Sequence, residues 1–231
     1  MGKLKKVTVD EIYYYGTGCG NATNAKMIAK VLKHLFTEAK VKVSTDIAAA
    51  AHATCGNKKG ITCILGTGSN VCYFDGKKIV KSRPGLGYAL GDEGSGAYLG
   101  KKVLQYYFYD VFYTDIKNEF EKAYPFDKSE ILDNIYKKPL ANRYLASFSK
   151  FLSAHRGDVM IENIIEDGLN DFFFLHLSRM KEARNLPVHF VGGVSFAFKD
   201  VLLNLCANYN FTSGLIIEKP MKRLVKFHTQ Q

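Results

Sequence analysis

Residues 61–79 read ITCILGTGSNVCYFDGKKI, and the glycine-threonine loop in their middle decides the fold. Short apolar runs predict strands over 61–65, 71–74 and 78–81, joined by the loop GTGSN and by a two-residue turn at Asp75-Gly76. Most glycine-rich loops that wrap phosphate lead into a helix, whereas this one joins two strands. We therefore expect a β-hairpin that carries a polar loop at its tip.

The loop itself offers donors that suit the oxygens of a phosphate group. Glycines at 66 and 68 let backbone N–H groups point into one concavity. Hydroxyl and amide donors are added by Thr67, Ser69 and Asn70. The sequence contains no G-x-x-x-x-G-K-[ST], and Val71 stands where a G-x-G-x-x-G motif needs its third glycine. A phosphate nest and an ordinary five-residue hairpin loop both remain open.

The composition is that of a folded globular protein with a basic surface. The chain has 231 residues, 47% of them hydrophobic, and a formal net charge of +10. The basic residues occur in scattered pairs without interleaved aromatic residues, which favours a solvated lysine-rich surface over a nucleic-acid partner. No apolar run is long enough to span a bilayer, so no membrane association is expected. Five cysteines without metal-ligand spacing indicate reduced core thiols and a cytoplasmic protein.

Strands and helices alternate in the opening section. A strand over 11–15 precedes a helix that we expect Asn24 to cap, with an apolar stripe of Met27, Ile28, Val31, Leu32 and Leu35. A second strand over 41–44 turns sharply at Thr45-Asp46 into an alanine-rich helix that Gly56 closes. This layout predicts an α/β fold with parallel pairing, and the change of pattern at 57–60 is the expected domain boundary.

The rest of the chain is mainly helical until a late return to strands. Helices with polar joints are expected over 119–157, and a long helix over about 161–179. The stretch PVHFVGGVSFAFKDVLLNLCANY predicts a strand, a Gly-Gly corner and a helix. SGLIIE predicts a further strand, and the last helix has Pro220 in its first turn.

Three further stretches could carry chemistry. Asp46, between a strand and a helix, could be a helix cap, a carboxylate that accepts a proton from a substrate hydroxyl, or both, since the two roles do not exclude each other. In GLGYALGDEGSG five glycines surround Asp92 and Glu93, which suits close recognition of a polyol or, alternatively, a flexible connector with a capping acid. The Gly192-Gly193 corner leaves flat backbone for an aromatic base and ribose, although such corners are common.

The order of these stretches resembles the sugar kinases of the actin/hexokinase superfamily. The motifs LGTGSN, GDEGSG and HFVGGV are most similar to those of the N-acetylglucosamine kinase branch and of the BadF/BadG-type ATPases. The stretches TDIAAAAHA and EIYYYGTGC agree with the same family in position and character. The resemblance implies an α/β, actin-like ATPase (ribonuclease H-like) fold of two domains. It divides the chain into a remnant of the N-terminal domain (1–57), a C-terminal domain with a helical insertion (58–218) and a terminal helix that returns to the N-terminal domain (219–231).

The same resemblance implies a role for each matching residue. Asp46 would be the general base and would also contact the sugar. Further sugar contacts would come from Gly85, Leu86, Gly87 and Asp92. ATP, with Mg²⁺ bridging its phosphates, would lie on the loop Gly66, Thr67, Gly68, Ser69 and Asn70 and on Gly192, Gly193 and Ser195. No residue is assigned as a metal ligand. The expected substrate is N-acetylglucosamine or a related hexosamine, and pairing into a homodimer stays open.

The sequence departs from this family in two places. Relatives begin with a strand carrying D-x-G-x-T, whereas the 231 residues contain no D-x-G-x-[ST]. An incomplete N-terminal domain with bare strand edges is therefore expected. Leu86 stands where animal relatives have tryptophan. Three functions follow: an ATP-dependent sugar kinase, a truncated and inactive relative that binds sugar or nucleotide, and a BadF-type ATPase that activates an electron-transfer partner through an iron–sulfur cluster.

Overall fold

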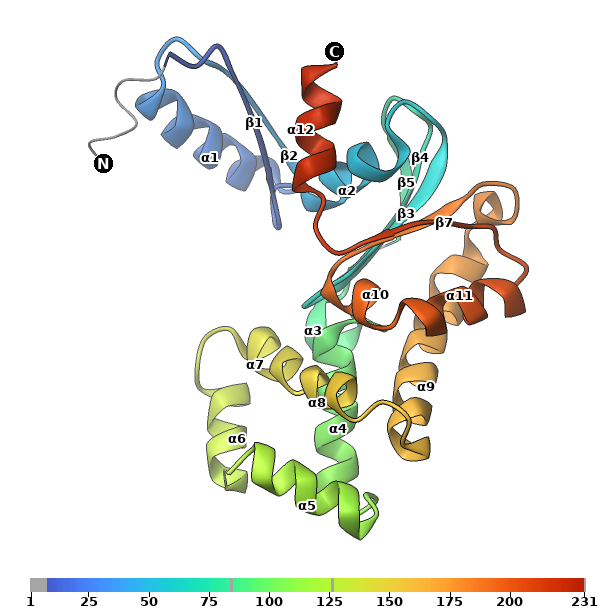
Figure 1. Cartoon of the computed structure of the whole chain (residues 1–231). Helices are drawn as coiled ribbons and strands as arrows, with labels where there is room; N and C mark the ends of the chain where they lie inside the picture. The colour runs from blue at the N-terminus through green and yellow to red at the C-terminus, as the bar shows by residue number, and fades with distance from the viewer. Residues whose placement is uncertain (1–7, 84, 126, 231) are drawn as a thin grey trace.

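The computed structural model describes residues 8–83, 85–125 and 127–230. Its strands form two sheets, one of two strands near the N-terminus and one of five strands at the centre (Figure 1). The mixed α/β architecture agrees with the predicted fold class. None of the helices in the described ranges is long and apolar enough to cross a membrane.

The central sheet begins with the predicted hairpin. Its strands are β3 (Gly60–Leu65), β4 (Ser69–Phe74), β5 (Ile79–Ser82), β6 (Val188–Val191) and β7 (Ser213–Ile217), in the spatial order β5-β4-β3-β6-β7. The β3–β4 and β4–β5 pairs are antiparallel, whereas β6 and β7 continue the sheet in parallel with β3. The expected two-residue turn is wrong: Asp75–Lys78 forms a four-residue turn, because the Asp75 carboxylate accepts from the amides of Lys77 and Lys78.

Both faces of the central sheet are covered, which explains the apolar character of β3. Ile61, Cys63 and Leu65 belong to the main core, which the helices on one side complete. On the opposite face, Ile64 packs with a second core that includes Ile47 and Ala51 of α2 (Asp46–Cys55). Alternate residues of a strand point to opposite faces, so one strand supplies both cores.

Helices follow the sheet in the order predicted, although their bounds differ. They are α3 (Gly87–Leu90), α4 (Gly96–Phe108), α5 (Thr114–Ala123), α6 (Lys128–Tyr136), α7 (Ala141–Ser147), α8 (Ser149–Ala154), α9 (Val159–Leu175), α10 (Gly193–Ala197) and α11 (Lys199–Asn208). Figure 1 shows α5 to α8 gathered below the sheet, around the lower part of α4. The long helix ends at Leu175 and not near 179; two 3₁₀ turns, Leu177–Arg179 and Lys181–Arg184, follow it.

The N-terminal unit consists of two parallel strands and two helices. β1 (Glu11–Gly16) pairs with β2 (Lys40–Thr45), so that Gly16 and Thr45 lie side by side at the carboxyl edge. α1 (Ala22–Leu35) is capped by Asn21, whose side chain accepts from the amides of Thr23 and Asn24. Our assignment of the cap to Asn24 is wrong, because the cap and the helix start lie three residues earlier.

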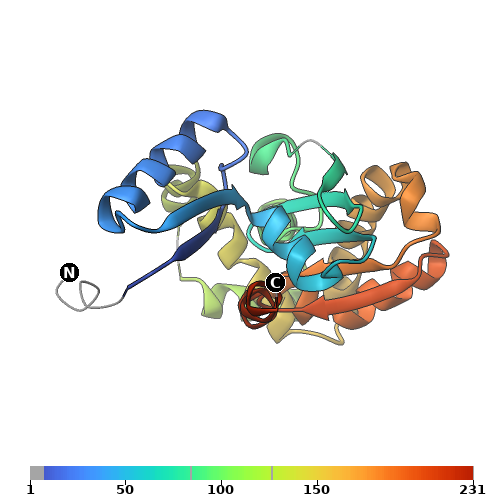
Figure 2. The same cartoon turned by 90° about the horizontal axis from the view of Figure 1, so that it is seen from above.

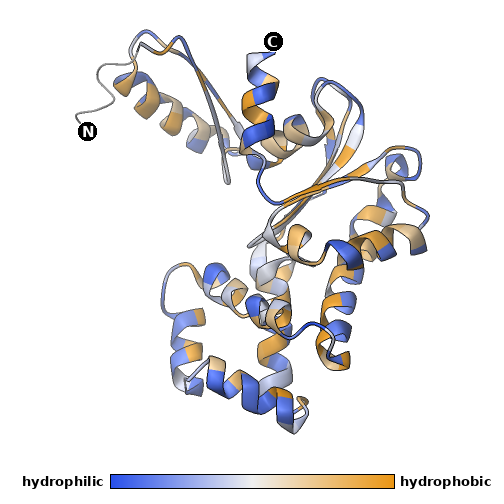
Figure 3. Cartoon of the chain, viewed as in Figure 1, coloured by the Kyte–Doolittle hydropathy of each residue, from blue (hydrophilic) through white to orange (hydrophobic). Residues whose placement is uncertain are grey.

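The apolar stripe of α1 is the clearest departure from expectation. No residue of this helix is buried, and Met27, Val31 and Leu35 are 61%, 54% and 57% exposed. Figure 3 shows hydrophobic residues on α1 as well as along the central strands. The periodicity predicted the helix correctly. Ile28 and Leu32 of the stripe are half-buried on the side of α1 that contacts β2, whereas Met27, Val31 and Leu35 lie outside this contact.

The last helix, α12 (Met221–Thr229), stands beside β1 and α2 (Figures 1 and 2). His228 stacks on Tyr13 at 3.8 Å between ring centroids. The Tyr15 hydroxyl lies 2.9 Å from Nε2 of His228 and 3.0 Å from Nδ1 of His52 on α2. On these contacts we propose that α12 belongs with the N-terminal unit, although it follows the C-terminal sheet in sequence.

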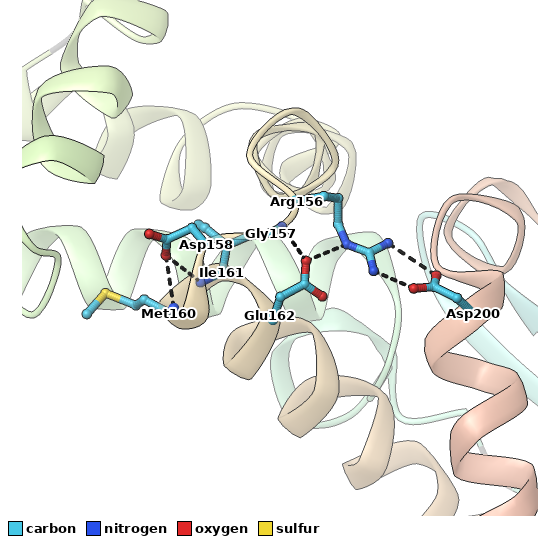
Figure 4. A network of polar contacts seen from close by, with 7 residues as sticks. All are labelled: Arg156, Gly157, Asp158, Met160, Ile161, Glu162 and Asp200. Atoms are coloured by element: carbon cyan, nitrogen blue, oxygen red, sulfur yellow. Dashed lines mark hydrogen bonds and ion pairs between the residues drawn. The ribbon is translucent and has the colours of Figure 1, made fainter.

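An arginine-centred network joins the start of α9 to α11 (Figure 4). Arg156 donates through Nε to Glu162 at 2.7 Å and binds both carboxylate oxygens of Asp200. Glu162 also accepts from the amide of Gly157. The guanidinium lies 5.7 Å from the ring centroid of Phe198, which precedes α11. A bidentate arginine pair fixes orientation as well as distance, so the network sets α11 relative to α9.

This network predicts an acid-sensitive part of the stability. Hydrogen bonds from Arg156 hold the pKa values of Asp200 and Glu162 below their ordinary values of 3.8 and 4.5. Acids with a lowered folded pKa stabilise fully above their unfolded pKa and lose that contribution as the pH falls. We expect Arg156→Gln to destabilise at about pH 7 and to differ less from the parent at about pH 3. Urea unfolding at both pH values measures this, and an equal loss at both would contradict it.

Candidate functional site

The predicted phosphate loop accepts hydrogen bonds from the first backbone amides of α4. The amide of Gly96 donates to the Gly66 carbonyl at 2.8 Å, and the amide of Ala97 donates to the Thr67 carbonyl at 3.1 Å. These groups are among the helix-end donors that otherwise lack partners. Buried Ser95 caps the same helix by accepting from the amide of Tyr98. The loop therefore has a fixed position relative to the residues just before α4.

Asp92 lies against the other side of this loop. Its Oδ1 accepts from the amide of Ser69 at 3.4 Å, and a Cβ on Gly68 would lie 3.0 Å from its Oδ2. Asp92 has a left-handed backbone, with φ of 59°, which turns the chain into α4. Burial raises the pKa of this carboxyl above its ordinary value. The loop and the acid, predicted separately, form one unit.

A cavity of about 190 Å³ opens beside Asp92. We call it the Asp92 cavity. It is lined by the polar residues Ser69, Asn70, Arg83, Asp92, Glu93 and His176, and by Val71, Gly85, Leu86, Gly91, Phe172 and Leu175. Nε2 of His176 lies 2.9 Å from Oε2 of Glu93, which fixes both side chains. Glu93 belongs to the glycine-acid stretch that the sequence analysis singled out, whereas Arg83 and His176 were not among the sequence candidates. His176 could not be found from a local pattern, because it follows α9 and is 83 residues away from Glu93 in the chain.

A second cavity, of about 500 Å³, borders the same loop at Gly66 and Thr67. We call it the Gly193 cavity. Its lining comprises Gly66, Thr67, Gly96, Ala146, Ser149, Lys150, Ser153, Gly193, Val194, Ala197 and Phe198. Lys150 is the one cation among these residues, and none of them is acidic. Sequence reasoning missed Lys150, since a lysine on an exposed helix has no distinguishing pattern.

The two cavities divide the loop that we expected to face phosphate as a whole. Gly66 and Thr67 line the Gly193 cavity, whereas Ser69 and Asn70 line the Asp92 cavity. Of the other candidates, Gly85, Leu86 and Asp92 also line the Asp92 cavity, and Gly193 lines the Gly193 cavity. Gly68, Gly87, Gly192 and Ser195 line neither.

Gly192 has a packing role instead. It has φ of +130°, and a Cβ there would overlap the carbonyl oxygen of Leu65 and lie 3.2 Å from the amide nitrogen of Gly66. Only glycine allows the end of β6 to come this close to the loop. Ser195 is fully buried, and its Oγ has no hydrogen-bond partner within the described ranges of the chain. The two glycines of the corner therefore do different things, since Gly193 faces open space.

Asp46 lies away from both cavities. It is the first residue of α2, at the carboxyl edge of β1 and β2, and its Oδ1 accepts from the amide of Ile47 at 2.8 Å. The hydroxyl of Thr17, from the loop after β1, donates to its Oδ2 at 2.9 Å. Helix capping itself is done by Thr45, which accepts from the amide of Ala48. Asp46 therefore helps to satisfy the start of α2 through the Ile47 amide, although Thr45 holds the N-cap position, and Thr17 also orients its carboxylate.

The described residues do not fit a metal held by protein side chains alone. Among them, no three His, Cys, Asp or Glu side chains are placed to hold an ion. All five cysteines are buried and free, as expected of core thiols. Burial raises the pKa of Cys72 and of Cys206 to about 12, which keeps these thiols protonated.

The chain belongs to the BadF/BadG/BcrA/BcrD ATPase family, whose pattern it matches over residues 1–209. A solved structure from Porphyromonas gingivalis, described as a candidate N-acetylglucosamine kinase, is 34% identical with a TM-score of 0.91. The match covers 96% of this chain and 78% of that protein. The resemblance to this family inferred from the sequence is therefore confirmed, together with the actin-like ATPase fold.

The chain is also similar to two more distant relatives. A candidate N-acetylglucosamine kinase from Chromobacterium violaceum shares the fold, with a TM-score of 0.65 at 20% identity over 90% of this chain and 73% of that one. The N-acetylmuramic acid/N-acetylglucosamine kinase of Clostridium acetobutylicum is 26% identical over 167 residues, or 68% of this chain. The match spans about half of that curated relative, 54% of its length.

The adjacent glycines 192 and 193 give a matched test of the site's packing. Gly192→Ala should cost about 1–3 kcal/mol or more in unfolding free energy, because the added carbon strikes the β3 backbone in a disfavoured conformation. Gly193→Ala should be close to neutral, since nothing lies within 4 Å of its added carbon. Urea unfolding of both variants measures the difference. Equal stability would show that β6 does not approach the loop as described.

Proposed function

We propose that this protein transfers the γ-phosphoryl group of ATP to N-acetylglucosamine or a related hexosamine. The observation that carries the proposal is one rigid loop between two cavities of different chemistry. The Asp92 cavity offers carboxylates and amides to sugar hydroxyls, whereas the Gly193 cavity offers hydroxyls, backbone and Lys150 to a nucleotide. For the transfer, the γ-phosphate and the attacking sugar hydroxyl would have to meet in line beside the loop residues Thr67 to Ser69, where the linings of the two cavities come closest in the chain.

The sugar would be held mainly on the Asp92 side. Asp92 would accept hydrogen bonds from its hydroxyls, and Ser69 and Asn70 would add contacts from the loop. Gly85 and Leu86 form part of the wall, and Gly87 starts the short helix behind it. This division moves Ser69 and Asn70 from the nucleotide, where the sequence suggested them, to the sugar.

ATP would lie in the Gly193 cavity. Thr67 and the Gly66 backbone would face the phosphates, and Gly193 with Phe198 would bed the adenosine. Gly192 and Ser195 do not line this cavity. They would support it indirectly, by holding the turn between β6 and α10 against the loop. Since the described residues provide no carboxylate set for Mg²⁺, the ion would arrive on the phosphates themselves, as is usual for nucleotide substrates.

Asp46 would act as the general base once the N-terminal unit closes. Its carboxylate, oriented by Thr17, would take the proton from the attacking sugar hydroxyl. Because it lines neither cavity, the β1–β2 unit must move toward the central sheet. Such closure also excludes water from the transferred group.

A second candidate is a relative that binds sugar or nucleotide without turnover. The absence of D-x-G-x-[ST] from the 231 residues motivates it, because that motif supplies half of the phosphate contacts in this superfamily by resemblance. Activation of an electron-transfer partner through an iron–sulfur cluster is less well supported, since all five thiols are buried.

The proposal is tested with a panel of sugars and two readouts. A coupled ADP-release assay should show turnover stimulated by N-acetylglucosamine, and titration calorimetry should show that the sugar binds. Binding without ADP release would favour the second candidate. If no hexosamine either binds or stimulates ADP release, both readings fail.

The two carboxylates should respond differently to neutralisation. Asp46→Asn should lower kcat by roughly 10²–10⁴-fold while sugar binding is retained, because it removes only the proton acceptor. Asp92→Asn should mainly weaken sugar binding. Steady-state kinetics and calorimetry separate these effects, and a loss of sugar affinity in Asp46→Asn as large as in Asp92→Asn would contradict the assigned roles.

Lys150 should matter for the nucleotide and not for the sugar. Lys150→Gln is expected to raise the KM for ATP about tenfold, the effect of losing ~1.4 kcal/mol of charge interaction with the phosphates. Lys138→Gln, which removes an exposed lysine that lines neither cavity, is the control. An unchanged KM for ATP in Lys150→Gln would remove this residue from the site.

A further inference from the structure

Two side chains in the Asp92 cavity carry polar atoms that the protein does not use. Arg83 follows β5, and its amide donates to the Val71 carbonyl at 3.2 Å. Its side chain lines the cavity, yet its Nε is buried and has no hydrogen-bond partner among the described residues. Leaving such a donor unpaired costs about 1–3 kcal/mol, so a group that satisfies it is favoured strongly.

His176 presents the complementary atom. A carboxylate can only accept, so Nε2 of His176 is the donor to Glu93, and in the neutral form of the ring Nδ1 then carries a lone pair. Nδ1 is also buried, without a hydrogen-bond partner among the described residues. Two side chains from separate segments, both lining the same small cavity, thus carry one unused donor and one unused acceptor.

The remaining walls are apolar. Val71, Leu86, Phe172 and Leu175 line the cavity beside these two side chains. An acetamido group has a carbonyl that accepts, an N–H that donates and a methyl group that needs apolar contact. A hydroxyl lacks the methyl and the carbonyl, and a free amine carries a charge, so neither matches all three features.

The charge of the cavity argues against a carboxylate substituent in the same place. Asp92 and Glu93 supply two acidic groups against the single permanent cation of Arg83. A further anion would meet this acidic pair in a half-closed space, where like charges repel strongly. A neutral polar group meets no such penalty.

We propose that Arg83 and His176 are the residues that select an N-acetylated sugar, with Arg83 donating to the acetamido carbonyl and Nδ1 of His176 accepting from its N–H. This inference rests on the proposed function and adds the specificity-determining contacts to it. Both atoms are closed off from solvent, so the side chains turn toward the sugar as it enters. The acetamido methyl then packs on Leu86 and Phe172.

The test compares N-acetylglucosamine with glucose and glucosamine, by calorimetry and by ADP release. The parent protein should bind N-acetylglucosamine at least about tenfold more tightly than glucose. Arg83→Met should remove most of this preference, measured as the ratio of the affinities for N-acetylglucosamine and glucose. His176→Gln retains an N–H for Glu93 but loses the Nδ1 acceptor, and it should reduce the preference in the same direction.

Lys81→Met is the matched control. Lys81 lies two residues before Arg83 on β5, pairs with Glu182 at 3.6 Å and does not line the cavity, so its loss should leave the preference unchanged. A preference that survives in both Arg83→Met and His176→Gln overturns the inference while the kinase proposal stands. Tighter binding of N-acetylmuramic acid that depends on Arg83 would also overturn it, by assigning this arginine to a carboxylate. If none of the sugars binds, the proposed function fails with it.

Discussion

Two hydrogen bonds from the N-terminus of α4 to the loop carbonyls of Gly66 and Thr67 are the contacts on which the site depends. They satisfy helix-end amides that would otherwise need water, and they fix a glycine-containing loop that could adopt many conformations. Because Asp92 and Ser95 immediately precede the same helix, the acid and the loop are positioned together. The two cavities then border a single rigid element.

The approach of β6 completes this arrangement. Gly192 lets the end of the strand touch the backbone of Leu65 and Gly66, and the next residue opens onto the Gly193 cavity. Arg156 links α11 to the start of α9 through its hydrogen bonds to Asp200. Phe198 lies near the guanidinium of this arginine and also lines the Gly193 cavity. The helical region and the sheet therefore share one support for the proposed nucleotide site.

The N-terminal unit is attached differently. Its helix α2 packs on the central sheet through Ile47 and Ala51, while α12 crosses back to contact Tyr13 and Tyr15. Asp46 is consequently carried on an element that contacts both sheets, outside either cavity. This placement is consistent with a unit whose closure brings a base to the substrate, which is why the proposed chemistry requires movement as well as contact.

The sequence by itself determined the order of the elements, the hairpin that presents the loop, and the family. Local patterns suffice for these, because alternation, glycine turns and contiguous words such as LGTGSN and GDEGSG are read within a few residues. Only the tertiary structure decided which cavity each loop residue lines and that Asn21 and not Asn24 caps α1. It showed as well that Met27, Val31 and Leu35 of the apolar stripe of this helix are exposed. It also decided that His176, Arg83 and Lys150 line the cavities, since these contacts join segments far apart in the chain. A one-dimensional pattern records what a residue is, whereas its partners depend on how distant segments pack.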